Sequence, residues 1–121
     1  MPKITGPKIT GPKITGPDIT SPSPCQTVIT TFETSPGTCQ DLLDALEEAY
    51  AGFISKQPGF IAAGLHVNDA QTRIANYSQW QSREDFQAML RSEEMREHNR
   101  RFNALCRSFE PVLYDVAATY G

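Results

Sequence analysis

Residues 58–82 read PGFIAAGLHVNDAQTRIANYSQWQS. Pro58 and Gly59 end the element that precedes them, because proline and glycine both interrupt regular structure. Two apolar stretches follow, residues 60–68 and residues 72–80, and each has the composition and length of a β-strand. The link between them, residues 69–71, is short and polar, as links between neighbouring antiparallel strands are. This part of the chain therefore predicts a β-hairpin.

The residues before the hairpin predict one strand and one helix. Residues 26–34 are rich in β-branched side chains, which favour a strand. After the turn at residues 35–38, apolar residues recur at three- and four-residue spacing, which is typical of an amphipathic helix. This stripe consists of Leu42, Leu43, Leu46, Ala49, Tyr50, Phe53 and Ile54.

The residues after the hairpin predict a second helical region and a last strand. Ser82 is the expected N-cap, with an acidic first turn behind it, and a break is expected near Ser92. A helical stripe then continues to Pro111, and residues 112–120 are expected to form a strand. The stripe consists of Met95, Phe102, Leu105, Cys106 and Phe109. The order β-α-β-β-α-β predicts an α+β, ferredoxin-like fold with a four-stranded antiparallel sheet.

In this fold both helical regions cover the same face of the sheet. The other face is too apolar to stay in water in a domain of 97 residues, 25–121. Small domains bury proportionally little surface, so two such sheets are expected to pair face to face. The sequence therefore predicts a homodimer whose two sheets form one dimeric α+β barrel.

The N-terminal residues repeat a five-residue unit. Residues 2–6, 7–11 and 12–16 each read PKITG, and residues 17–21 read PDITS. Six of the nine prolines lie in residues 1–24, where they oppose both helix and central strand. We expect residues 1–24 to form a flexible, Pro-rich repeat arm and residues 25–121 to form the folded domain.

Composition narrows the function classes. The chain has 121 residues, a formal net charge of −3 and three cysteines without a Cys-x-x-Cys pair. The negative charge disfavours nucleic acid as a partner, since phosphates require clustered Lys and Arg. Apolar runs are too short to cross a membrane, and no secretory signal is recognisable. The odd cysteine count disfavours a disulfide scaffold, so a cytoplasmic location is expected.

No familiar catalytic signature is present. His66 and His98 are the only histidines, and neither stands in a metal-ligand pattern, so no metal site is predicted. Nucleotide, flavin and serine-hydrolase motifs are also missing, and we expect no cofactor. An enzyme of this kind must act on a substrate that supplies much of the reactivity itself.

Strand periodicity suggests a pocket beneath the helices. Alternation puts Asn76 and Trp80 on one face of their strand, and it groups Phe60, Gly64 and His66 on the preceding strand. A hairpin loop of three or five residues would put His66 on the same side as Asn76, whereas two or four residues would not, unless a bulge intervened. The expected lining of this apolar slot is Phe60, Phe86, Met89 and Phe102, over Gly64. Such a slot suits a planar aromatic ligand.

Each of these residues also has a purely structural interpretation. Asn76 can be a satisfied amide within the sheet, and Trp80 can anchor the core at the end of a strand. His66 can be a surface residue near the hairpin end. The arginines of the last helix, Arg96 and Arg100 among them, can form a solvated face paired with neighbouring glutamates.

Part of the sequence resembles a known family. Pro58-Gly59-Phe60, then His66, then residues 76–82 (NYSQWQS) resemble the antibiotic biosynthesis monooxygenase family, and within it the actinorhodin-type quinone-forming monooxygenases. The resemblance covers about residues 26–120. It implies a dimeric α+β barrel that oxidises an anthrone-type aromatic polyketide to a quinone with O2, without metal, flavin or haem.

The resemblance also implies roles for individual residues. Asn76 and Trp80 would be the polar pair at the reacting carbon, with His66 assisting in proton transfer. An arginine of the second helical region would stabilise the enolate. Arg96 and Arg100 are both candidates for that arginine, and Arg96 is favoured because Arg100 points away from the apolar stripe.

Three other functions remain open. A polyketide cyclase on the same barrel would also need a flat apolar pocket and enolate stabilisation. A haem-degrading relative would need a histidine where Leu90 stands and an asparagine within residues 26–34, which contain none. A non-enzymatic alternative is a small dimeric binding module with the repeat arm as its partner contact.

Overall fold

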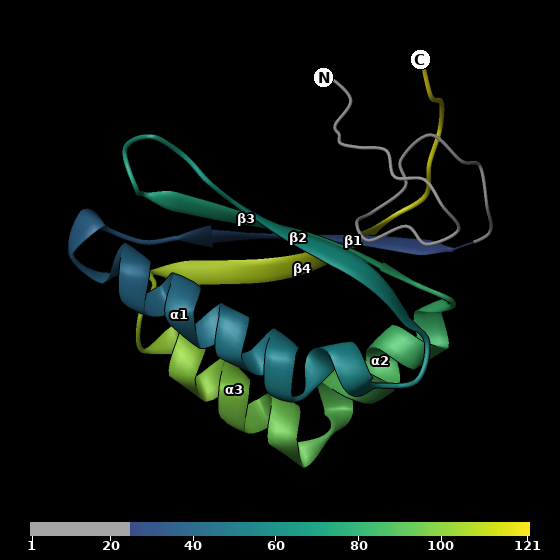
Figure 1. Cartoon of the computed structure of the whole chain (residues 1–121), viewed down its shortest axis with the longest axis horizontal. Helices are drawn as coiled ribbons and strands as arrows, with labels where there is room; N and C mark the ends of the chain where they lie inside the picture. The colour runs from purple at the N-terminus through teal and green to yellow at the C-terminus, as the bar shows by residue number, and fades with distance from the viewer. Residues whose placement is uncertain (1–24) are drawn as a thin grey trace.

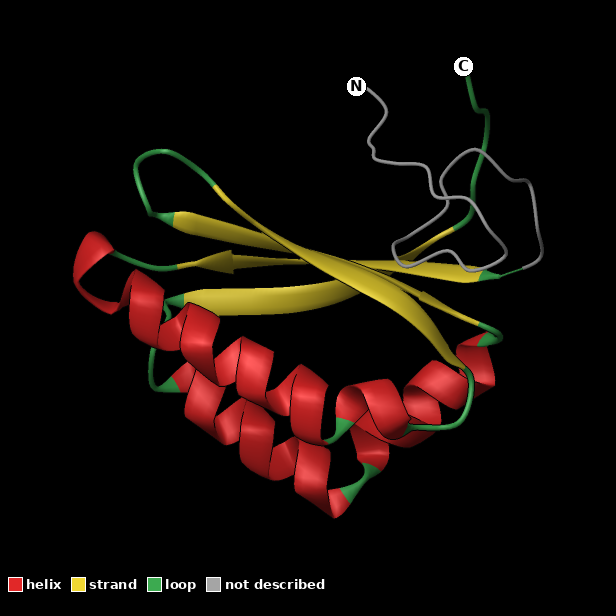
Figure 2. Ribbon diagram, in the orientation of Figure 1, coloured by secondary structure: helices red, strands yellow, loops and turns green. Residues whose placement is uncertain are grey.

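The computed structural model describes residues 25–121, so the repeat arm predicted over residues 1–24 lies outside the described residues. A four-stranded sheet with strand order β2-β3-β1-β4 carries all the helices on one face (Figures 1 and 2). The strands are β1 (Gln26–Glu33), β2 (Phe60–Val67), β3 (Arg73–Trp80) and β4 (Ser108–Tyr114). The helices are α1 (Pro36–Gly52), the 3-10 turn η1 (Ile54–Lys56), α2 (Arg83–Arg91) and α3 (Glu93–Asn103). The predicted ferredoxin-like α+β fold is confirmed.

The register of β3 determines which of its side chains face the helices. β3 pairs antiparallel with β1 on one side and β2 on the other, and directly paired residues share a face. Asn76 lies opposite Thr30, and Trp80 lies opposite Gln26. Ile74 and Trp80 are 0% and 1% exposed, so the even-numbered residues of β3 face the helices as predicted.

The register of β2 differs from the prediction. An irregularity between Phe60 and Ala62 shifts the alternation, and beyond it Leu65, rather than His66, lies opposite Asn76. Residues 68–73, an even number, lie between the paired residues Val67 and Ile74. Across the hairpin, odd-numbered residues of β2 are therefore paired with even-numbered residues of β3, so His66 cannot lie on the same face as Asn76. Phe60 therefore faces the helices, whereas Gly64 and His66 lie on the opposite face of the sheet.

The last strand also differs from the prediction. β4 is Ser108–Tyr114, so it begins four residues before residue 112 and contains Pro111. Proline is tolerated there because β4 is an edge strand, where the missing N–H need not interrupt a ladder. Phe109 belongs to this strand rather than to a helical stripe, and its ring stacks on Phe32 with centroids 4.9 Å apart.

The predicted helix starts at Ser82 and Ser92 are confirmed. The Ser82 hydroxyl accepts a hydrogen bond from the Asp85 N–H. Ser92 ends α2 and caps α3, since its hydroxyl accepts from the Met95 N–H at 3.2 Å and donates to the Met89 carbonyl at 2.8 Å. Met89 and Met95, one from each helix, are thereby both turned toward the core.

Replacing Ser92 with alanine should lower the free energy of unfolding by about 1–2 kcal/mol, because it removes a helix cap. Urea denaturation followed by circular dichroism measures this change. Ser35→Ala is the matched control, since Ser35 is the N-cap of α1 but its side chain makes no capping hydrogen bond. An equal loss of unfolding free energy in the two variants would contradict the conclusion that the Ser92 side chain caps α3.

Candidate active site

A cavity of about 250 Å³ lies between the sheet and the helices. This volume is just below the range of about 300–1,000 Å³ that is usual for small-molecule sites. Most of its lining is apolar, and polar side chains reach it from β1, α1, β3 and α3. The lining residues are Thr30, Phe32, Leu46, Tyr50, Ile54, Asn76, Met89, Leu90, Met95, Asn99, Phe102, Phe109 and Pro111. None of these carries a formal charge at neutral pH.

Asn76 is the predicted catalytic residue that reaches this cavity. Its side chain is 8% exposed, and its Oδ1 accepts a hydrogen bond of 3.0 Å from the Tyr50 hydroxyl of α1. Since Oδ1 is engaged, the Nδ2 amide hydrogens are the donors that remain for a ligand. Asn76 therefore presents a hydrogen-bond donor at the floor of an apolar cavity.

Tyr50 is held in its neutral form. Burial raises the pKa of the Tyr50 phenol above its ordinary value, and a hydrogen bond with the Ser78 side chain opposes that rise only in part. At neutral pH the phenol therefore keeps its proton and acts as a donor to Asn76.

Trp80 lies beside the cavity rather than in its lining. The indole is 1% exposed and is packed between Phe60 and Phe86, with ring centroids 5.4 and 5.7 Å away. Its Nε1–H donates to the Ser78 hydroxyl at 3.3 Å. Trp80 and Asn76 thus share the helix-facing side of β3, but only Asn76 borders the empty space.

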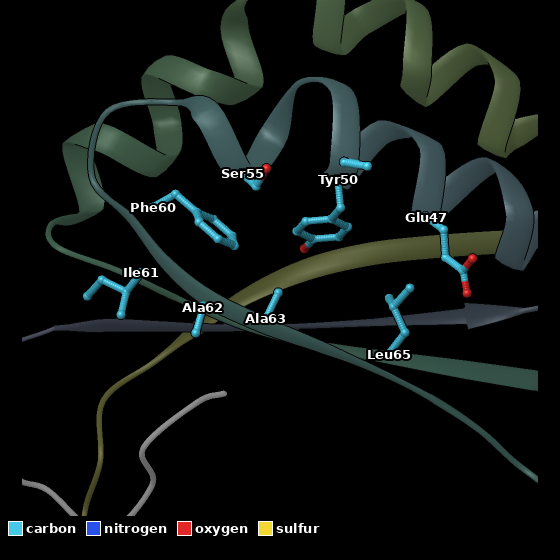
Figure 3. A pocket seen from close by; sticks show the side chains of 9 residues that line it. Glu47, Tyr50, Ser55, Phe60, Ile61, Ala62, Ala63 and Leu65 are labelled. Atoms are coloured by element: carbon cyan, nitrogen blue, oxygen red, sulfur yellow. The ribbon is translucent and has the colours of Figure 1, made fainter. Parts of the chain in front are cut away.

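The predicted apolar lining is divided between the cavity and its neighbours. Met89 and Phe102 line the cavity itself. Phe60 lines a second, more open groove of about 500 Å³ between α1 and β2, and Tyr50 borders both spaces (Figure 3). Phe86 packs against Trp80. Of the four apolar residues expected to line the slot, Met89 and Phe102 border the cavity, Phe60 borders the groove and Phe86 lies in the adjoining aromatic cluster.

The structure does not bring His66 or Gly64 to the cavity. His66 is exposed and pairs with Ala75, and Gly64 pairs with Tyr77, so both lie on the sheet face that carries no helix. The cause is the shift in β2 between Phe60 and Ala62 together with the even spacing of the hairpin. The expectation that His66 and Asn76 share a face is wrong.

The two candidate arginines also lie away from the cavity. Arg96 and Arg100 are both exposed, and Arg100 forms an ion pair of 2.6 Å with Glu97 on its own helix. A helix turns by about 100° per residue, so Arg96 is rotated by that angle from the buried Met95. In their place, Asn99 of α3 borders the cavity.

Tyr50, Thr30 and Asn99 are the polar lining residues that sequence reasoning missed. Tyr50 was expected only as part of an apolar stripe. The signal that points to it is chemical, since a tyrosine buried in a helix stripe needs a hydrogen-bond partner for its hydroxyl. That partner lies on another element and is visible only in the folded chain.

Two further features of the described part of the chain bear on its function. Within residues 25–121, no group of three or more His, Cys, Asp or Glu side chains is placed to hold a metal ion. In the same residues, every helix is too short or too polar to span a membrane. Within the described residues, none of Cys25, Cys39 and Cys106 forms a disulfide.

The buried phenol of Tyr50 should make stability depend on alkaline pH. Unfolded tyrosine ionises near pH ~10, and folded Tyr50 keeps its proton to higher pH. Above about pH 10 the unfolded state then binds fewer protons than the folded state, so the free energy of unfolding falls as pH rises. Urea denaturation at pH 8–11 should show a shallower fall for Tyr50→Phe. Tyr120→Phe, which removes a phenol that is 92% exposed, is the control. Superimposable profiles for wild type and Tyr50→Phe would refute this assignment.

Comparison with known proteins agrees with this geometry. The family model described as antibiotic biosynthesis monooxygenase matches residues 26–101. The chain is 30% identical over 98 residues to the Tetracenomycin-F1 monooxygenase of Streptomyces glaucescens, covering 78% of this chain and 84% of that protein.

Two solved structures share the fold. The ActVA-Orf6 monooxygenase of Streptomyces coelicolor, in complex with nanaomycin D, has a TM-score of 0.74 and 19% identity, covering 86% of this chain and 97% of that one. SnoaB, a cofactor-independent oxygenase from Streptomyces nogalater, has a TM-score of 0.71 and 20% identity, covering 80% and 97%. The family match extends over more than half of the chain and confirms the predicted resemblance. The chain belongs to the antibiotic biosynthesis monooxygenase family and is a monooxygenase of that family.

Proposed function

We propose that this chain is a cofactor-independent monooxygenase that oxidises an anthrone-type aromatic polyketide to a quinone with O2. The observation that carries the proposal is the apolar cavity with the Asn76 carboxamide at its floor and the Asn76 oxygen already bonded to Tyr50. The names of its relatives, a tetracenomycin F1 monooxygenase and two oxygenases from Streptomyces, support a polyketide substrate.

The chemistry requires little from the protein. The CH2 carbon of an anthrone lies between two aromatic rings and opposite a carbonyl, so loss of its proton gives a delocalised enolate. This electron-rich anion transfers one electron to O2, and recombination of the two radicals forms a hydroperoxide. Loss of water then leaves the quinone carbonyl. One oxygen atom enters the product and the other leaves as water.

The cavity supports this sequence by stabilising the enolate and excluding bulk water. The Asn76 Nδ2–H donates to the developing oxyanion, and aromatic and thioether side chains such as Phe102 and Met89 enclose the flat rings. His66, Arg96 and Arg100 lie away from this space, so we propose no role for them in proton transfer or enolate binding. The acidity of the substrate itself then provides the enolate: the CH2 proton passes to water as the substrate enters, and the peroxide anion formed by recombination takes up a proton before water is lost.

Dithranol, a stable anthrone, tests the proposal. Metal-free protein should accelerate the formation of 1,8-dihydroxyanthraquinone in air, with one O2 consumed per product, and should form none under nitrogen. Absorbance and an oxygen electrode follow the two quantities together.

Asn76→Ala should lower the rate by about 10- to 1000-fold, as the loss of an oxyanion donor does. Asn103→Ala, at an exposed position on α3, is the matched control. Wild-type rates in Asn76→Ala, or turnover without oxygen uptake, would contradict the proposal, and the second result would favour a cyclase.

We also propose that two chains associate through the sheet faces that carry no helices. On this face Val112 and Tyr114 are 37% and 48% exposed, and the half-buried Ile29 lies beside Val112 in the paired strand. Clustered apolar side chains of this kind favour association over exposure to water.

Light scattering coupled to gel filtration should therefore give twice the mass of one chain, and Val112→Asp should shift the protein toward the single-chain mass. Val67→Asp is the matched control. Val67 is similarly exposed at 38%, but it lies opposite Ile74 on the helix-facing side. Dissociation by both variants, or by neither, would argue against this interface.

A further inference from the structure

Three polar side chains behind Asn76 have no function in the reaction as described so far. Tyr50 lines the cavity, whereas Ser78 and Trp80 are 3% and 1% exposed and share the helix-facing side of β3 with Asn76. We propose that they are positioning residues, forming one directed hydrogen-bond chain that holds the Asn76 carboxamide with its NH2 group toward the ligand. This inference deepens the proposed function and rests on it for its consequence in catalysis.

The direction of the chain starts at Trp80. An indole N–H can only donate, and the Trp80 Nε1–H donates to the Ser78 Oγ at 3.3 Å. The Ser78 oxygen is therefore an acceptor in this bond, which leaves its own hydroxyl hydrogen for the next partner. We infer that this partner is the Tyr50 phenol, because the Ser78 side chain lowers the pKa of that phenol as a hydrogen-bond donor does.

The chain ends at Asn76. The phenol oxygen accepts from Ser78, so the single phenol hydrogen is directed onward, and it donates to the Asn76 Oδ1 at 3.0 Å. The two ends of a carboxamide have nearly the same shape, and only hydrogen bonding decides which end points where. A donor at Tyr50 selects the oxygen, and Nδ2 is turned the other way.

This orientation matters for the reaction. A carboxamide rotated by half a turn would present its oxygen to an enolate, and two negative oxygens would then repel each other. A hydrogen-bond chain whose members all donate in the same direction also polarises each member, which makes the last N–H a stronger donor. Trp80 thereby acts on the ligand through Ser78, Tyr50 and Asn76, without itself touching it.

Nuclear magnetic resonance tests the orientation without any turnover. In ¹⁵N-labelled full-length protein, the Asn76 side-chain NH2 signals are assigned by their loss in Asn76→Asp. Tyr50→Phe and Ser78→Ala should each shift these signals, because each removes one link of the chain. Tyr120→Phe, an exposed phenol, should leave them unchanged.

Kinetics with dithranol test the consequence. Tyr50→Phe should lower kcat by about fivefold to tenfold with little change in KM, as expected for the loss of one neutral hydrogen bond that matters in the transition state. In an Asn76→Ala background the same substitution should change kcat by less than about twofold, since the chain then has nothing to orient.

The two proposals can fail separately. Shifted Asn76 signals without any dithranol oxidation by the wild type would keep the positioning chain and reject the anthrone substrate. Unchanged Asn76 signals in Tyr50→Phe would overturn the positioning chain, whatever the activity. An equal loss of kcat in the wild-type and Asn76→Ala backgrounds would overturn it as well.

Discussion

The pairing of β3 with a strand on each side fixes the direction of the side chains that β3 contributes to the candidate site. Asn76, Ser78 and Trp80 all lie on the helix-facing side because they occupy every second position of a strand held by β1 and β2. A slip of one residue would turn all of them to the uncovered face at once. The cavity floor, the aromatic cluster and the hydrogen-bond chain thus depend on one register.

Much of this fold is local in origin and is visible in the sequence. The alternation along β3 and the serine caps at Ser82 and Ser92 follow from residues within a few positions of one another. β2 and β4 could not be predicted as well, because the irregularity after Phe60 and the placement of Phe109 depend on which strands become neighbours. Phe109 continues a helical spacing by coincidence, and its real partner is Phe32, far away in the sequence.

In the candidate site too, features set by local sequence could be predicted and features set by long-range contacts could not. Asn76 could be identified because its strand is regular, but the residue bonded to it is Tyr50, 26 positions earlier on α1. His66 and the arginines were expected from family resemblance. A resemblance transfers residue types, whereas the face that a residue occupies depends on bulges, loop parity and helix rotation in the particular chain. In this chain those features exclude His66, Arg96 and Arg100 from the cavity.

The break at Ser92 makes the helical wall of the cavity easier to open than the sheet beneath it. The floor of the cavity is formed by β1 and β3, the two interior strands, and by Phe109 and Pro111 of the edge strand β4. The opposite wall is formed by α1 together with α2 and α3, two helices of 9 and 11 residues that meet at Ser92. Local unfolding costs least where the fewest hydrogen bonds must open, so we expect the junction of α2 and α3 to open more readily than the paired interior strands. A ligand bound at Asn76 on β3 would then stay in place while that junction opens.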